Sequence, residues 1–332
     1  MNQNDLQEKF NGRSVLVTGG LGFIGSSLSK KLVELGAKVT ILDALLEPYG
    51  GNKFNIADIE DKVELVNGNI LDEELISKLV TGTDYIFHLA GQVGYLDAKR
   101  KPFVDLEFNG RGNLIMLEAI KENAPDARIL FSSSRLIYGK IKKIPVKESH
   151  QTEPLSLYGI HKLLGEKYYA YYAHNFGVHG MSMRIPNPYG PKQQMKHSKY
   201  SIVGWFIRQA MEGKTIDIFG DGKQVRDYIY IDDIVDAMLH LIVNGDDGEA
   251  YNIGSGSKVT FTDMVDEVIK AVGQGDKRYV DWPEDYEKNE TGNYLADTKK
   301  IDKATNWKPQ VSLEDGLKKT VEFYTKNKEF YW

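Results

Sequence analysis

Residues 18–25 read Thr-Gly-Gly-Leu-Gly-Phe-Ile-Gly, and this glycine-rich stretch decides the fold. A short apolar run at 14–18 precedes it. Apolar residues at helical spacing follow it over 24–35, and Gly36 ends that pattern. The local order is therefore strand, tight turn and helix.

The glycines of this turn stand where side chains would obstruct a bound pyrophosphate. Gly19 permits the tight turn, Gly22 lets the anion approach the backbone, and Gly25 lets helix and strand pack closely. The free N–H groups and the dipole of the helix N-terminus favour negative charge at this point. The turn therefore predicts a dinucleotide-binding site.

The acid at the end of the second strand indicates which dinucleotide binds. This strand, expected at 38–43, ends on Asp43, eighteen residues after Gly25. An acid at this spacing can accept hydrogen bonds from ribose hydroxyls, and its charge would repel the extra phosphate of NADP. Asp43 thus predicts NAD, unless it only ends a strand. Asn69, after the third strand, is expected either to meet the adenine edge or to serve in a plain turn.

Strands and helices alternate over much of the chain. Short apolar runs predict strands at 63–67, 84–90, 128–132, 179–185 and 250–253, and helical spacing predicts helices at 73–81, 107–123 and 156–175. Such alternation is typical of a doubly wound parallel sheet.

Two stretches interrupt the alternation and predict a second lobe. We expect an α/β fold in which residues 1–185 and 228–257 form a Rossmann-type doubly wound parallel sheet. Residues 186–227 and 258–332 are expected to form a smaller mixed α/β substrate-binding lobe. That lobe should cover the carboxyl ends of the strands, where open α/β sheets bind ligands.

The composition narrows the possible chemistry. The 332 residues include no cysteine, which excludes disulfides, thiolate metal sites and cysteine nucleophiles. The net charge of -5 does not favour binding to nucleic acid. No apolar run suffices for a membrane span, the polar N-terminal stretch is not a secretory signal, and no histidines have metal-ligand spacing. We expect a cytoplasmic protein that binds small molecules.

Tyr158 and Lys162 lie four residues apart at a predicted helix start, so they share one helix face. A phenol has a pKa near 10, so a tyrosine base at neutral pH needs roughly 4 kcal/mol of stabilisation. A cation about 4 Å away at an effective dielectric near 20 supplies about this much. We expect Lys162, helped by the positive ring of NAD⁺, to lower the pKa of the phenol.

Several further motifs occur in the order seen in extended short-chain dehydrogenases/reductases, which this chain resembles. They are the glycine turn, His88-Leu89-Ala90-Gly91, Asn109, the run from Phe131 to Gly139, the pair Tyr158 and Lys162, and the run from Arg184 to Pro191. The block from Gly220 to Asp227 is similar to that of nucleotide-sugar epimerases and dehydratases. The resemblance spans nearly the whole chain.

This resemblance implies roles for individual residues. Tyr158 would take the proton of a sugar hydroxyl, and Lys162 would hold the nicotinamide ribose. Ser134 would hydrogen-bond the reacting oxygen, with Ser133 as the alternative. His161 departs from the family, which usually has a serine there.

The resemblance also implies binding residues. The expected cofactor site comprises Gly19, Gly22, Phe23, Ile24, Gly25, Asp43, Asn69, Ile70, Leu89, Ala90, Gly91, Tyr158, Lys162 and Pro186, and the expected substrate site comprises Ser133, Ser134, Asn187, Phe219, Gln224 and Arg226. Asn187 and Arg226 match positions that hold a diphosphate, and Phe219 matches the base pocket. We expect a homodimer, and the tyrosine-rich stretch 168–172 should either pack internally or join a dimer helix bundle.

The residues after Ser134 separate the reactions of the family. Dehydratases have an Asp-Glu pair where this chain has Arg135 and Leu136, and sugar-acid decarboxylases usually keep a glutamate at the position of Leu136. Reductases commonly use NADPH, whose phosphate Asp43 disfavours. A redox-neutral epimerase fits best.

Which carbon inverts stays open. Inversion at C4 is the first expectation. The motifs at 88–93, 203–206 and 222–227 also resemble CDP-sugar 2-epimerases, and a ketosugar reductase is a third alternative. A catalytically silent, NAD-sensing protein of the same fold is the non-enzyme alternative, because fold alone does not prove activity.

Overall fold

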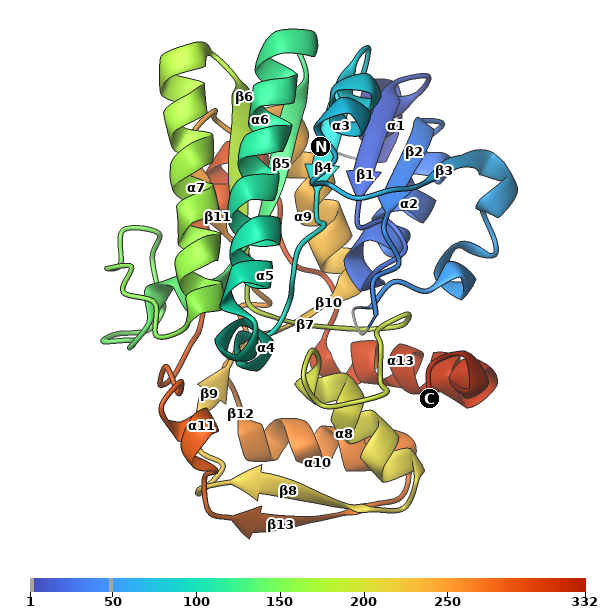
Figure 1. Ribbon diagram of the computed structural model, residues 1–332. Helices are drawn as coiled ribbons and strands as arrows, with labels where there is room; N and C mark the ends of the chain where they lie inside the picture. The colour runs from blue at the N-terminus through green and yellow to red at the C-terminus, as the bar shows by residue number, and fades with distance from the viewer. Residues whose placement is uncertain (1–2, 48–49) are drawn as a thin grey trace.

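The computed structural model describes residues 3–47 and 50–332. Its largest sheet has seven parallel strands in the order β11-β6-β5-β4-β1-β2-β3 (Figure 1). These strands are β1 (Ser14–Thr18), β2 (Lys38–Asp43), β3 (Val63–Asn67), β4 (Tyr85–His88), β5 (Arg128–Ser134), β6 (His179–Ile185) and β11 (Ala250–Asn252). The predicted Rossmann-type sheet is thereby confirmed.

Helices cover both faces of this sheet because side chains alternate along each strand. On β1, Val15 and Val17 enter one core and Leu16 enters the other. Figure 1 shows the second face covered by α3 (Glu73–Val80), α6 (Gly112–Asn123) and α7 (Leu157–Phe176), with α2 (Phe23–Glu34) and α9 (Ile231–Asn244) behind the sheet. Each strand is therefore buried on both sides, as in other parallel sheets.

Helix α7 has well-defined ends and packs closely against the sheet. Ser156 caps its first turn by accepting from the Gly159 amide at 3.2 Å, and Gly177 ends it in the left-handed conformation. A Cβ at Gly165 would lie 2.7 Å from the Phe131 ring, so only glycine permits this approach to β5. The helix start is thus held beside the carboxyl end of β5.

Some boundaries differ from those expected. The strand predicted at 84–90 ends at His88, and the one predicted at 128–132 continues to Ser134. The helix predicted at 107–123 begins with a π-helical turn, η3 (Glu107–Arg111). Two short helices before it, α4 (Tyr95–Arg100) and α5 (Pro102–Leu106), were not expected.

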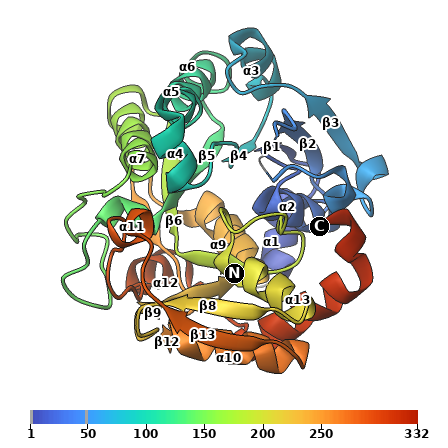
Figure 2. The same cartoon turned by 60° about the horizontal axis from the view of Figure 1, so that its bottom comes forward.

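A second lobe lies below the carboxyl ends of the strands (Figures 1 and 2). In it β8 (Thr215–Phe219) pairs with β13 (Asp276–Val280), and β9 (Val225–Arg226) pairs with β12 (Val259–Thr260). β7 (Asn187–Tyr189), expected in this lobe, pairs with β10 (Tyr228–Tyr230), expected in the larger one. The accompanying helices are α8 (Ile202–Met211), α10 (Phe261–Val272), α11 (Glu284–Glu287) and α13 (Leu313–Asn327). Helix α12 (Lys299–Thr305), which was expected in the smaller lobe, instead packs against α9 and β11 of the larger one.

Helix α1 (Gln3–Phe10) packs against α9, and its Phe10 is fully buried. Short 3-10 turns complete the described chain at Lys53–Ile56, Glu60–Lys62, Arg135–Tyr138 and Lys328–Phe330. Within residues 3–47 and 50–332, no helix is long and apolar enough to cross a membrane.

Candidate functional site

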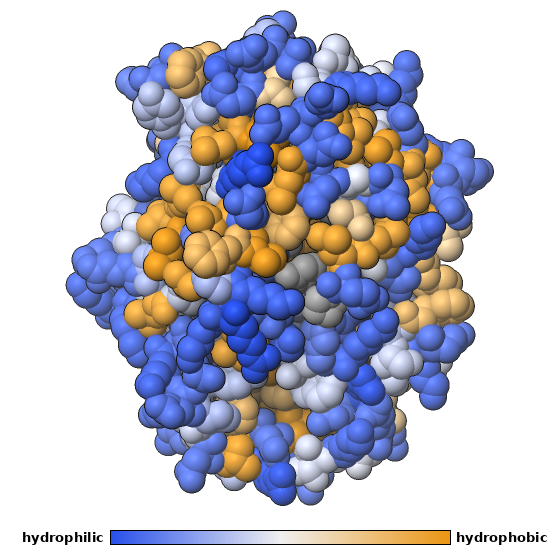
Figure 3. Space-filling view, in the orientation of Figure 1, coloured by the Kyte–Doolittle hydropathy of each residue, from blue (hydrophilic) through white to orange (hydrophobic). Residues whose placement is uncertain are grey.

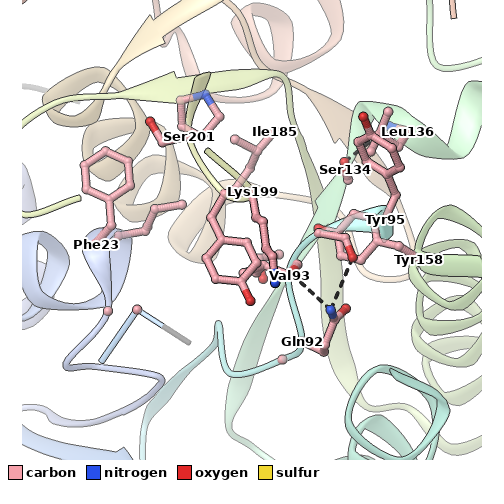
Figure 4. Close-up of a pocket in the computed structure, with 18 of the residues that line it drawn as sticks. Phe23, Gln92, Val93, Tyr95, Ser134, Leu136, Tyr158, Ile185, Lys199 and Ser201 are labelled. Carbon is pink, nitrogen blue, oxygen red and sulfur yellow. Dashed lines mark hydrogen bonds between the residues drawn. The ribbon is translucent and has the colours of Figure 1, made fainter. Parts of the chain in front are cut away.

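Every cofactor and substrate residue expected from the sequence lines one cavity of about 520 Å³. The cavity also receives residues from the smaller lobe, including Phe261 and Trp282. Figure 4 shows Tyr95, Ser134, Leu136 and Tyr158 gathered on one side of it and Phe23 on the opposite side. The fold therefore brings together residues that are far apart in the sequence.

The glycine turn is built for close approach of backbone to ligand. Gly19 has a φ of +70°, and its carbonyl accepts from the Gly22 amide at 3.1 Å. A Cβ on Gly25 would lie 2.3 Å from the Gly19 oxygen, so this position has no room for any side chain. The open N-terminus of α2 faces the cavity as an anion site, which fits a pyrophosphate.

Asp43 lies at the end of β2 on the cavity wall. One carboxylate oxygen accepts from the Leu21 amide at 3.0 Å and the other from the Leu45 amide at 2.9 Å. Partial burial raises the pKa of Asp43, while these two amide bonds act in the opposite direction. The carboxylate thus orders the turn around it and retains lone pairs for ribose hydroxyls.

Asn69 also has a local structural role. Its side-chain oxygen accepts from the Leu71 amide at 3.0 Å, which closes an Asx turn, and the residue lines the cavity beside Ile70. The turn alternative weighed from the sequence is therefore present. The contact with adenine stays a prediction.

The catalytic candidates meet at the start of α7. Burial raises the pKa of Tyr158, and the charge of Asp105 raises it further, while a hydrogen bond with Ser134 lowers it. Ser134 also accepts from the Leu136 amide at 3.2 Å. The Ser133 hydroxyl instead donates to Glu166 at 2.5 Å, so the geometry favours Ser134 as the partner of the reacting oxygen.

Lys162 is almost completely buried one helical turn after Tyr158. Its ammonium donates to the Ser132 carbonyl at 3.0 Å and lies 4.9 Å from the centre of the Phe131 ring. Burial lowers the pKa of Lys162 to about 8, against an opposing effect of Asp105. The ammonium lies 5.8 Å from the centre of the Tyr158 ring. Burial and the charge of Asp105 act against the expected lowering of the Tyr158 pKa by Lys162, which stays a prediction.

His161 has a specific buried partner that the sequence did not indicate. Its Nδ1 hydrogen-bonds Asp105, whose other oxygen accepts from Asn109 at 3.0 Å. Asn109 also donates to the Gln92 carbonyl at 2.9 Å. Asp105 thus links α7, η3 and the loop after β4 behind the catalytic candidates.

The substrate half of the cavity has an aromatic wall. Phe219 lies 5.6 Å from Trp282 and 5.3 Å from Tyr286, measured between ring centres. Tyr286 in turn meets Tyr95 edge-on at 6.2 Å. Phe219 was expected here. Trp282 and Tyr286 were not, although the clustering of Trp and Tyr in the tail was the available signal.

Arg226 lines the cavity, but its guanidinium already has partners. Nη2 donates to both oxygens of Glu290 at 2.7 and 2.6 Å, and Nη1 donates to the carbonyls of Val225 and Gly292. Gln224 lines the same wall, and its amide lies 3.5 Å from the Phe219 carbonyl. An anion at Arg226 would share the guanidinium with Glu290.

The comparisons with known proteins identify the family of the chain. The model of the NAD dependent epimerase/dehydratase family matches residues 15–254. The chain therefore belongs to this family, and NAD is its cofactor. The glycine cradle and Asp43 provide the residues that such a cofactor requires.

Individual relatives match over almost the full length. A putative UDP-glucose 4-epimerase of Methanocaldococcus jannaschii is 32% identical over 94% of this chain and 99% of its own. A CDP-paratose 2-epimerase of Salmonella typhi is 29% identical over 93% of this chain and 98% of its own. The crystal structure of UDP-glucose 4-epimerase with UDP-glucose from Thermotoga maritima superposes with a TM-score of 0.87, at 32% identity, and covers 95% of this chain and 99% of that one.

The position of Asp43 generates a prediction about cofactor choice. Asp43→Asn keeps an oxygen for one of the two neighbouring amides and removes the charge that is expected to face the ribose. We expect NAD⁺ affinity to fall by about tenfold or more, because a hydrogen bond to a charged group contributes roughly 1.5–3 kcal/mol. NADP⁺ affinity should fall less or rise. Titration calorimetry with both cofactors measures the ratio, and equal affinities in the unmodified protein would contradict the assignment.

Asp105 generates a prediction about pH. Its charge raises the pKa of Tyr158 and of Lys162, so Asp105→Asn should lower both. Both limbs of the profile of kcat/KM against pH should therefore move to lower pH. The acid limb moves because the phenol loses its proton at lower pH, and the alkaline limb moves because the ammonium does so as well. Thermal unfolding verifies that the variant is folded. An unmoved profile in a folded variant would show that Asp105 does not act on the pair.

Proposed function

We propose that this protein inverts C4 of a nucleotide-activated sugar, with Tyr158 as the base and a 4-ketosugar as a transient intermediate. The observation that carries the proposal is the meeting of Ser134, Tyr158 and buried Lys162 in one cavity with the glycine cradle and Asp43. The full-length similarity to UDP-glucose 4-epimerases supports this choice of carbon.

The roles of the side chains follow from their positions. Ser134 would donate to the oxygen of the reacting carbinol, and Tyr158 would accept its proton. NAD⁺ held by the glycine cradle and Asp43 would supply the acceptor for the hydride of that carbon, and its reduced form would supply the same hydride for return to the opposite face. Lys162 would hold the nicotinamide ribose and keep positive charge behind the phenol. No net oxidation results, so no second reductant is needed.

Neighbouring residues argue against elimination of water. Arg135 and Leu136 directly follow Ser134 on the cavity wall, so no acid–base pair stands at these two positions. Inversion at C2 is the second candidate, because the CDP-paratose 2-epimerase is also similar over nearly the whole chain.

The base is tested by Tyr158→Phe, which keeps the ring and deletes the proton acceptor. Turnover should fall by about 10²–10⁴, the range for general acid–base catalysis, while NAD binding and thermal unfolding stay unchanged. Progress is followed by NMR on UDP-, CDP-, GDP- and dTDP-sugars. A variant that retains full turnover would remove Tyr158 from this role.

The inverted carbon is tested with deuterium. Substrate labelled at C4 should give a C4 epimer that keeps its deuterium without added NADH, because the hydride returns to the carbon it left. The same result from C2-labelled substrate, with inversion at C2, would identify the alternative. Product formation in proportion to added NADH or NADPH would instead show a reductase and overturn the proposal.

We also propose that the protein forms a homodimer through α5 and α7. Phe103 is 80% exposed, and Leu106 and Ile160 are 39% and 45% exposed on these neighbouring helices. Figure 3 shows apolar side chains gathered over this face. Exposed apolar patches of this kind mark sites of association.

The dimer is tested by Phe103→Glu, which places a charge in the proposed interface. Sedimentation equilibrium should show a dimer for the unmodified protein and a shift towards monomer for the variant, because burying an unpaired carboxylate is strongly unfavourable. Tyr279→Glu, at a 52% exposed position of β13, is the control and should remain dimeric. An unmodified protein that is monomeric would refute the interface.

A further inference from the structure

Arg135 is a cavity residue for which the proposed reaction has no role. It follows Ser134 at the end of β5 and begins the 3-10 turn Arg135–Tyr138. Its Nε donates to the side-chain oxygen of Asn187 at 3.1 Å, and its Nη1 donates to the Thr291 hydroxyl at 2.9 Å. The guanidinium also lies over the Tyr294 ring, 5.4 Å from its centre. These contacts fix it on the cavity wall.

The other cations of the cavity wall have clear partners. Arg226 is paired with Glu290, and Lys199 is paired with Asp97 at 3.0 Å. Lys162 donates to a backbone carbonyl and belongs to the catalytic group. Arg135 has neutral hydrogen-bond partners, and across residues 3–47 and 50–332 no carboxylate lies within ion-pair distance of it. Its Nη2 donates to no described group.

The surroundings of Arg135 disfavour a bare positive charge. Burial lowers the pKa of Arg135 to about 10, and the nearby charge of Arg226 lowers it further, against an opposing effect of Glu290. The carboxylate of Asp227 is also close, but its oxygens accept from Ser255 and Ala296. A buried charge is tolerated when a partner of opposite sign compensates it, so the free side of this guanidinium suits an anion.

We propose that Arg135 binds an oxyanion of the substrate, using its free Nη2 side. This inference rests on the proposed function, because it requires a nucleotide sugar in the cavity. The planar fork of an arginine fits both a phosphate and a carboxylate. Two groups can supply the oxyanion: the diphosphate, near Asn187 and Arg226, or a carboxylate on the sugar, near Ser134. In the first case Arg135 contributes to the affinity for every nucleotide sugar, and in the second it determines specificity for an acidic sugar.

The test compares binding of three probes, UDP, UDP-glucose and UDP-glucuronate, by titration calorimetry. Arg135→Gln removes the charge but keeps a polar side chain. If the diphosphate is the ligand, the variant should bind all three probes about tenfold or more weakly. If a sugar carboxylate is the ligand, only UDP-glucuronate should bind that much more weakly. Either pattern supports the proposal.

Further variants separate charge from folding. Arg135→Lys should recover part of the lost affinity, because lysine restores the positive charge but not the planar guanidinium. Arg278→Gln makes the same chemical change at an exposed position of β13 that pairs with Asp217, and it should leave all three affinities unchanged. NAD binding and thermal unfolding establish that each variant is folded.

Two outcomes would overturn the inference. If Arg135→Gln binds all three probes within about twofold of the unmodified protein, Arg135 does not bind a substrate oxyanion and the proposed function stands. If the unmodified protein binds no UDP-, CDP-, GDP- or dTDP-based probe, the proposed function fails, and the inference about Arg135 fails with it.

Discussion

The position of α7 depends on a buried ion pair between this helix and the sheet. Glu166 of α7 accepts from Nε and Nη2 of Arg184 on β6, at 2.9 and 2.7 Å, and also from Ser133 on β5. Breaking a buried pair by removing one partner commonly costs about 3–5 kcal/mol, because the other charge is left uncompensated. Glu166 lies one helical turn after Lys162, so the pair that anchors the helix also sets the depth of the ammonium in the cavity.

The sequence predicted the framework well because the framework follows local rules. Alternating strands and helices, the three glycines and the acid at the end of β2 each depend on near neighbours, and β1, β2 and β3 begin and end where the pattern placed them. The shared cavity also followed, since parallel strands bring their carboxyl ends to one edge. The π-helical turn Glu107–Arg111 could not be read this way, because helical spacing does not distinguish a widened turn from a regular one.

The hydrogen-bond partners of the site residues could not be predicted from the sequence, because they lie on distant segments of the chain. Asp105 and His161, or Arg226 and Glu290, are more than fifty residues apart in the chain, and no spacing rule connects them. The aromatic wall has the same origin, since Trp282 and Tyr286 reach Phe219 only after β13 has paired with β8. Sequence reasoning named residues that face the cavity but not the contacts that hold them there.

Electrostatics within the cavity bear on the proposed role of Tyr158 as a base. Burial and Asp105 both favour the neutral phenol, and Ser134 is the group that opposes them. Burial lowers the pKa of Lys162 to about 8, only slightly above neutral pH. Within the protein alone, the balance of these effects raises the pKa of Tyr158. Positive charge brought beside the phenol by bound NAD⁺ would favour release of its proton. A protein that retains its cofactor between turnovers would therefore keep the proposed base ready, which suits the proposed reaction with no net redox change.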